Sequence, residues 1–113
     1  MAKGHEKHKA RLDAINFHGK DLARRAKRKC ELCEEANDLR PYDTKPDDEP
    51  ELDTLILLCA RCRGLADGGD ADSRTLRFLE GAVWNEHTHI ATVARAVLAR
   101  VDAQWARDTL DML

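Results

Sequence analysis

Apolar residues recur at helical spacing in the first and last thirds of the chain. The clearest stripe steps through i, i+3, i+4, i+7, i+8 and i+11 and consists of Ile90, Val93, Ala94, Val97, Leu98 and Val101. A single apolar face of this kind packs against a core. The pattern therefore predicts a helix that begins at Thr88 or His89.

Weaker helical patterns flank this segment. Residues 4–17 and 20–29 predict two helices with a break at His18-Gly19, because Lys and Arg cover all faces but one. A short helix is expected over residues 75–83, after an N-cap at Asp72 or Ser73. A last amphipathic helix carries apolar residues that we expect to pack on the core, namely Trp105, Leu110, Met112 and Leu113.

The middle of the chain has a different pattern. Residues 34–58 contain three prolines and an acidic string, which favours an extended loop. Residues 54–58 are apolar and partly β-branched, so they predict a short strand. We expect a small β-hairpin under each cysteine pair, and a fold class of α+β, mostly helical, with a zinc-ribbon or treble-clef-like module flanked by N- and C-terminal helices.

The cysteines supply the most specific chemistry in the sequence. There are four, and they form two C-x-x-C pairs with 25 residues between them, Cys30 with Cys33 and Cys59 with Cys62. Tetrahedral zinc takes four thiolates at about 2.3 Å, and each pair brings two thiolates to one ion. The spacing predicts one structural Zn²⁺ whose four positions are all filled by sulfur.

Other roles for the cysteines fit less well. A disulfide framework belongs to secreted chains, and residues 1–5 show no apolar segment of a signal peptide. A single redox C-x-x-C would leave the second pair unexplained, whereas an iron–sulfur centre also takes four thiolates. We expect a cytoplasmic zinc protein and keep iron–sulfur and thiol redox chemistry as alternatives. No apolar run reaches about 18 residues, so no membrane association is expected.

Charge is segregated along the chain. Residues 1–29 hold ten Lys or Arg against three acidic residues, residues 30–72 hold thirteen acidic against four basic residues, and residues 73–113 hold five of each. We expect a single domain over 1–113, made of a basic helical arm, a zinc-binding module and C-terminal helices. With only 4% aromatic residues the core is small, so structural zinc, worth about 10 kcal/mol or more, would contribute much of the stability.

The end of the basic arm is a candidate nucleic-acid surface. It carries five positive charges, Arg24, Arg25, Lys27, Arg28 and Lys29. Such a run can neutralise phosphates, but it can equally be a solvated helix face, and it has no interleaved aromatic residues for base stacking. The arm could also lie on the acidic module, either in its own chain or in a homodimer. The sequence leaves these alternatives open.

Acidic residues and histidines outside the cysteine pairs carry weaker signals. Asp47, Asp48, Glu49, Glu51 and Asp53 lack the spacing of a calcium loop, so we expect a solvated acidic loop. His87 and His89 are separated by one residue, which places them on opposite sides of a helix and disfavours a shared metal unless the backbone is extended.

Two family resemblances follow from the motifs. The order C-x-x-C, polar loop, aliphatic strand, C-x-x-C is similar to the zinc-bearing frame of HNH nucleases, but Tyr42 and Asp43 lie where that family places catalytic histidines. Without an imidazole base, we do not expect phosphodiester cleavage.

A second resemblance covers nearly the whole chain. It rests on residues 3–12, 19–27 and 84–86, on both cysteine pairs, on the expected helix at 90–101, and on residues 105–106 and 110–113. In these segments the chain resembles the N-terminal zinc-ribbon region of PhnA-family (YjdM-like) proteins. The resemblance implies that the four cysteines are zinc ligands and nominally links the chain to alkylphosphonate utilisation.

These observations lead to one expected function and two alternatives. We expect a zinc-binding, PhnA-like protein that binds an unknown ligand or partner rather than catalysing a reaction. One alternative is a nucleic-acid-binding protein that uses the basic arm. The other is a metal-dependent phosphonate hydrolase that depends on His87 or His89.

Overall fold

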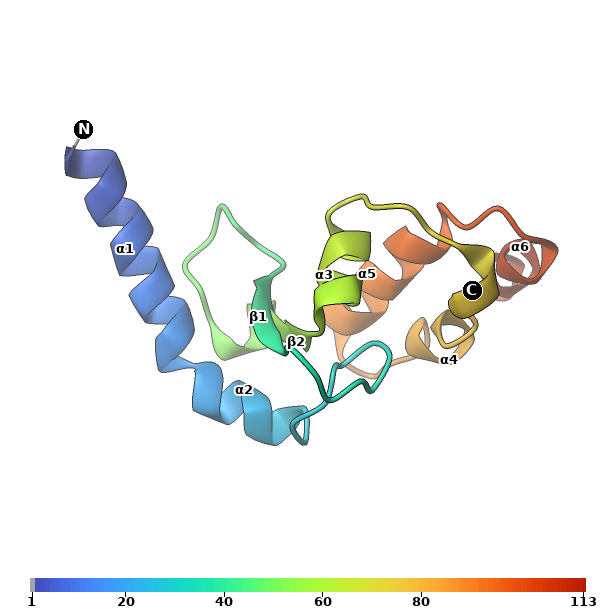
Figure 1. Cartoon of the computed structure of the whole chain (residues 1–113), viewed down its shortest axis with the longest axis horizontal. Coiled ribbons are helices and arrows are strands. Elements are labelled where there is room, and N and C mark those ends of the chain that lie inside the picture. Colours follow the sequence, from blue (N-terminus) through green and yellow to red (C-terminus); the bar gives the residue numbers. More distant parts are fainter. Residues whose placement is uncertain (1) are drawn as a thin grey trace.

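Two short antiparallel strands pair at the centre of the computed structural model (Figure 1). In β1 (Arg40–Asp43) and β2 (Leu55–Leu58), Arg40 pairs with Leu58 and Asp43 with Leu55. The structure describes the backbone of residues 2–113 and the side chains of residues 7–113, so the side chains at the start of the PhnA-like motif lie outside the described residues. Helices surround the hairpin, which confirms the expected α+β, mostly helical class.

The N-terminal arm consists of two helices, α1 (Ala2–Phe17) and α2 (Gly19–Arg25). The expected break at His18 is confirmed, and α1 extends away from the body (Figure 1). The expectation that the second helix continues to residue 29 is wrong. Lys27 and Arg28 adopt left-handed backbone conformations, with φ of 55° and 58°, and the Arg28 amide donates to the Ala23 carbonyl at 2.9 Å. This capping turn ends the helix and redirects the chain toward Cys30.

Strand β2 is buried on both faces. Leu55 and Leu57 pack with Leu22 of α2, whereas Ile56 and Leu58 belong to the main core. Alternate residues of a strand point to opposite faces, and here each face is covered. This explains why the sequence shows a continuous apolar run instead of alternating apolar and polar residues.

The main core lies between the hairpin and the C-terminal helices. Helix α3 (Ala60–Ala66) lies beside α5 (Thr88–Leu98), and α4 (Leu79–Ala82) and α6 (Gln104–Asp111) close the far end (Figure 1). The apolar stripe is confirmed from Ile90 to Leu98, because Ile90, Ala94 and Val97 are almost completely buried, but the expected continuation to Val101 is wrong, since α5 ends at Leu98. None of the helices in residues 2–113 combines the length and the apolar composition needed to cross a bilayer.

Three expectations about local structure need correction. Only one hairpin forms among the described residues, and the first cysteine pair lies in a turn instead of a second hairpin. The proline-containing segment 34–58 is not an extended loop throughout, because it contains strand β1. The helix expected over residues 75–83 is split into a 3-10 turn, Ser73–Thr75, and the short α4. The Asp72 side chain accepts from the Arg74 amide at 3.0 Å and so caps the 3-10 turn, whereas the N-cap of α4 is Phe78.

The terminal apolar residues do not all pack on the core. Met112 is 65% exposed and Leu113 is 43% exposed. Helix α6 ends at Asp111 and buries Ala106 and Thr109. The two last residues lie beyond the helix and therefore do not follow its buried face.

Candidate metal centre

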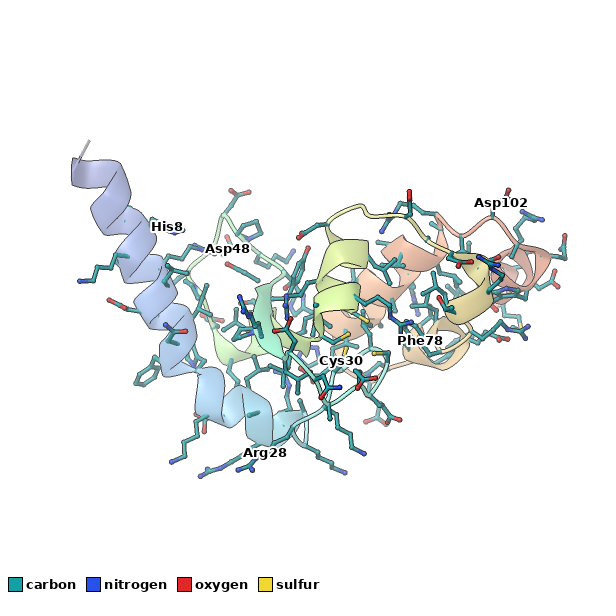
Figure 2. All side chains as sticks on the ribbon, in the orientation of Figure 1. His8, Arg28, Cys30, Asp48, Phe78 and Asp102 are labelled. Carbon is teal, nitrogen blue, oxygen red and sulfur yellow. The ribbon has the colours of Figure 1, made fainter. Side chains whose placement is uncertain are left out.

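Two structural elements bring the four cysteines together. Cys30 and Cys33 lie in the turn after α2, where the Glu34 amide donates to the Cys30 carbonyl at 2.9 Å and the Cys30 amide donates to the Glu35 carbonyl at 2.8 Å. Cys59 is the N-cap of α3 and Cys62 lies in its first turn. Residues three apart share one side of a helix, so this pair faces the turn. Figure 2 shows sulfur atoms gathered near Cys30, at the lower end of α3.

The sulfur geometry fits a four-coordinate ion. One ligand atom from each of the four cysteines lies within 4.8 Å of all the others, and the Sγ atoms of Cys33 and Cys59 are 3.6 Å apart. A tetrahedral site with bonds of about 2.3 Å requires sulfur atoms about 3.8 Å apart. The described residues thus place four free thiols at distances at which they could hold a metal ion.

The thiols of Cys30, Cys59 and Cys62 are buried, whereas that of Cys33 is partly exposed. A hydrogen bond from Cys62 lowers the pKa of Cys30 to about 4, although burial opposes this change. The same hydrogen bond, together with burial, raises the pKa of Cys62, and burial raises that of Cys33. Cys62 and Cys33, whose pKa values are raised, therefore retain protons that a divalent cation would displace, because metal ligation requires thiolates.

A positive side chain lies beside the cluster. Burial lowers the pKa of Arg61, but the side-chain hydrogen bond with Cys33 and the charges of the neighbouring cysteines together outweigh this effect and raise it. The Arg61 guanidinium also lies 5.2 Å from the centre of the Phe78 ring, which restrains its position. Four thiolates around a divalent ion carry a net charge of about −2, so this cation would partly offset the excess negative charge.

The turn that carries the first pair is anchored by Glu31. The Glu31 amide donates to the Leu57 carbonyl at 2.8 Å, and the Leu57 amide donates to the Glu31 carboxylate at 2.9 Å. Arg25 donates to the same carboxylate at 2.8 and 3.2 Å and to the carbonyls of Leu52 and Leu55 at 2.8 and 2.6 Å. The ion pair links α2, the turn and β2, and it fixes the first cysteine pair relative to the hairpin.

This anchoring corrects one predicted site residue. Arg25 was placed in the candidate nucleic-acid surface, but its guanidinium is directed into the fold and its side chain is only 25% exposed. The other four members, Arg24, Lys27, Arg28 and Lys29, are exposed. Arg28 points away from the body in Figure 2. The candidate surface therefore has four available positive charges.

The structure also brings together three residues for which the sequence analysis predicted no contact. Asp53, treated above as part of a solvated loop, lies 3.4 Å from Nε2 of His87 and 3.7 Å from Nε2 of His89. His87 is the N-cap of α5 and has an extended backbone, with φ −76° and ψ 115°. His87 therefore meets the condition of an extended backbone, under which both imidazoles can reach the same side.

Sequence patterns could not identify Glu31, Arg25 or Asp53 as partners in these clusters. Each is a single charged residue without a spacing motif, and its role depends on contacts with distant segments. The comparisons add no relative: no protein-family model, no curated protein and no solved structure matches this chain. The PhnA-like resemblance stays a prediction that rests on the motifs alone.

Proposed function

We propose that this chain is a PhnA-like zinc-binding protein that acts by binding and not by catalysis. The observation that supports the proposal is the convergence of four cysteine sulfurs from two separate elements, all within 4.8 Å of one another. Four thiolates match the ligand preference of Zn²⁺ in structural sites, in which no position is left for water or substrate.

The order of elements favours a treble clef over a zinc ribbon. A treble clef places one ligand pair in a turn and the other in the first turn of a helix, with a β-hairpin between them. Here the turn at Cys30 is followed by β1, β2 and then α3, which begins at Cys59. A ribbon would carry its second pair in another hairpin, and residues 59–66 form a cap and a helix instead.

Metal analysis of the purified chain tests this proposal. Atomic emission should find one zinc per chain after dialysis, and replacement by Co²⁺ should give the intense thiolate-to-metal charge-transfer bands of a tetrahedral sulfur site. Cys59→Ser should remove both signals. Iron with inorganic sulfide at the site would contradict zinc, and a folded chain without metal would contradict a structural role.

Nucleic-acid binding is a second candidate, supported by one specific observation. The four exposed side chains Arg24, Lys27, Arg28 and Lys29 lie on the end of α2 and the turn after it. Lys27 and Arg28 adopt left-handed backbone conformations in this exposed turn. Four phosphate contacts would give a logarithmic salt slope of about −3 to −4.

Fluorescence anisotropy with duplex and single-stranded oligonucleotides over a range of salt tests this candidate. Replacement of the four exposed residues by Gln should abolish the salt-dependent affinity. The matched control is a quadruple replacement by Gln of basic residues on the C-terminal half, Arg74, Arg77, Arg95 and Arg107, which should leave the affinity within about twofold. Equal losses in both variants would point to net charge alone and would count against a surface on α2.

A further inference from the structure

Two imidazoles and a carboxylate converge outside the cysteine cluster. The oxygens of Asp53 lie 3.4 Å from Nε2 of His87 and 3.7 Å from Nε2 of His89, with one oxygen toward each ring. In a tetrahedral site with bonds of about 2.0–2.1 Å, neighbouring nitrogen and oxygen ligands are about 3.4 Å apart. Each contact uses a different carboxylate oxygen, and these three residues do not bring one ligand atom each within 4.8 Å of one another as the four cysteines do, so binding one ion requires the side chains to turn.

The backbone explains how residues separated by one position reach the same carboxylate. His89 lies in the first turn of α5, whereas His87 precedes the helix with an extended ψ of 115°. The His87 amide donates to the Asn85 side chain at 2.8 Å, which holds this conformation. The objection that a helix would separate the two rings therefore does not apply.

The ring nitrogens of His87 lack hydrogen-bond partners within the part of the protein that the structure describes. Among the described residues, neither ring nitrogen of His87 has a hydrogen-bond partner, although both nitrogens are buried, and the 3.4 Å contact with Asp53 is an ion-pair distance without hydrogen-bond alignment. Leaving a buried polar group unpaired is destabilising. A metal ion on one nitrogen would remove part of this cost.

The surroundings of His87 disfavour protonation of its ring. Burial, followed by the nearby Arg25 guanidinium, lowers its pKa. The ring is therefore neutral at neutral pH, with a lone pair available for ligation. His89 also lines a cavity of about 320 Å³ with Tyr42 and Thr92.

We propose that Asp53, His87 and His89 form a second divalent-cation site, suited to Zn²⁺, Co²⁺ or Ni²⁺, which take imidazole and carboxylate ligands. The ring centres of the two histidines lie 5.8 Å apart, so the rings move closer to bind one ion. Asp53, with a side chain 77% exposed, is free to turn toward it. With three protein ligands and this adjustment, the site binds more weakly than the sulfur cluster.

The test is a titration of the full chain after the sulfur site has been filled with one equivalent of zinc. Calorimetry with added Ni²⁺ should show one further equivalent. Asp53→Asn and His89→Ala should each weaken this second binding by at least tenfold, while the first equivalent of zinc is retained. The matched controls are Asp48→Asn, in the same acidic loop, and His8→Ala on α1; both residues are exposed and labelled in Figure 2.

Imidazole nitrogen shifts give an independent readout. With added Zn²⁺ the ¹⁵N resonances of His87 and His89 should move together, whereas those of His8 should not. Absence of a second equivalent in the wild-type chain would overturn the proposal, and so would undiminished binding in the variants. If His89→Ala does not fold, Asp53→Asn decides the question, because Asp53 is on the surface. The outcome is independent of which metal occupies the sulfur cluster.

Discussion

The ion pair between Arg25 and Glu31 provides the sharpest test of how the cysteine turn is held. Replacing Arg25 by Ala removes four hydrogen bonds, two to Glu31 and two to the carbonyls of Leu52 and Leu55. The Glu31 carboxylate, only 7% exposed, would keep the Leu57 amide as its remaining partner. The change therefore leaves a buried charge without its counter-ion.

The size of the effect follows from burial. Removing one partner of a buried ion pair costs about 3–5 kcal/mol. Arg25 is one-quarter exposed, and Glu31 retains one donor, so the lower end applies and we expect a loss of about 3 kcal/mol. For 113 residues the entropy of unfolding is about 0.24 kcal/mol/K, so the melting temperature should fall by about 12 °C.

The assay is urea and thermal unfolding followed by circular dichroism at a fixed free-metal concentration, because bound metal adds to the measured stability. The matched control is Arg24→Ala, which removes the same charge from the adjacent exposed position and should change the free energy of unfolding by about 0.5 kcal/mol or less. Equal unfolding midpoints for the two variants would refute the structural role given to Arg25.

Three further outcomes are expected. Cys62→Ser replaces a fully buried sulfur and should release the metal to a chelator that leaves the wild-type chain loaded, as measured by atomic emission after dialysis. Leu58→Ala should cost about 2–5 kcal/mol in urea unfolding, because Leu58 is completely buried, whereas Leu12→Ala, at a half-exposed position, should cost far less. Burial, with the Arg25 guanidinium, lowers the pKa of His87 in the folded chain below its ordinary value of 6.5. As the pH falls, His87 is therefore protonated in the unfolded chain at a higher pH than in the folded chain, and this favours unfolding. With one equivalent of metal bound, the free energy of unfolding should decline below about pH 6.5, and His87→Gln should flatten that decline.

The spacing of apolar residues and the position of glycine predicted helices that pack through a single apolar face. The stripe from Ile90 to Leu98 is helical and buried as expected, and the break at His18 is where Gly19 suggested it. The strand at Leu55–Leu58 was also predicted correctly, but its partner β1 was not, because Pro41 and its polar neighbours resemble a loop. Pairing with the fully buried β2 makes this segment a strand.

The sequence by itself determined the candidate metal ligands, because two C-x-x-C pairs constrain the chemistry before any fold is known. Only the tertiary structure decided which charged residues are available on the surface and which are used internally. Arg24 and Arg25 are neighbours in one basic run, yet one is exposed and the other is bound to Glu31. The physical reason is that a thiolate ligand set depends on local spacing, whereas the partner of a single charge or imidazole depends on which distant segments pack against it.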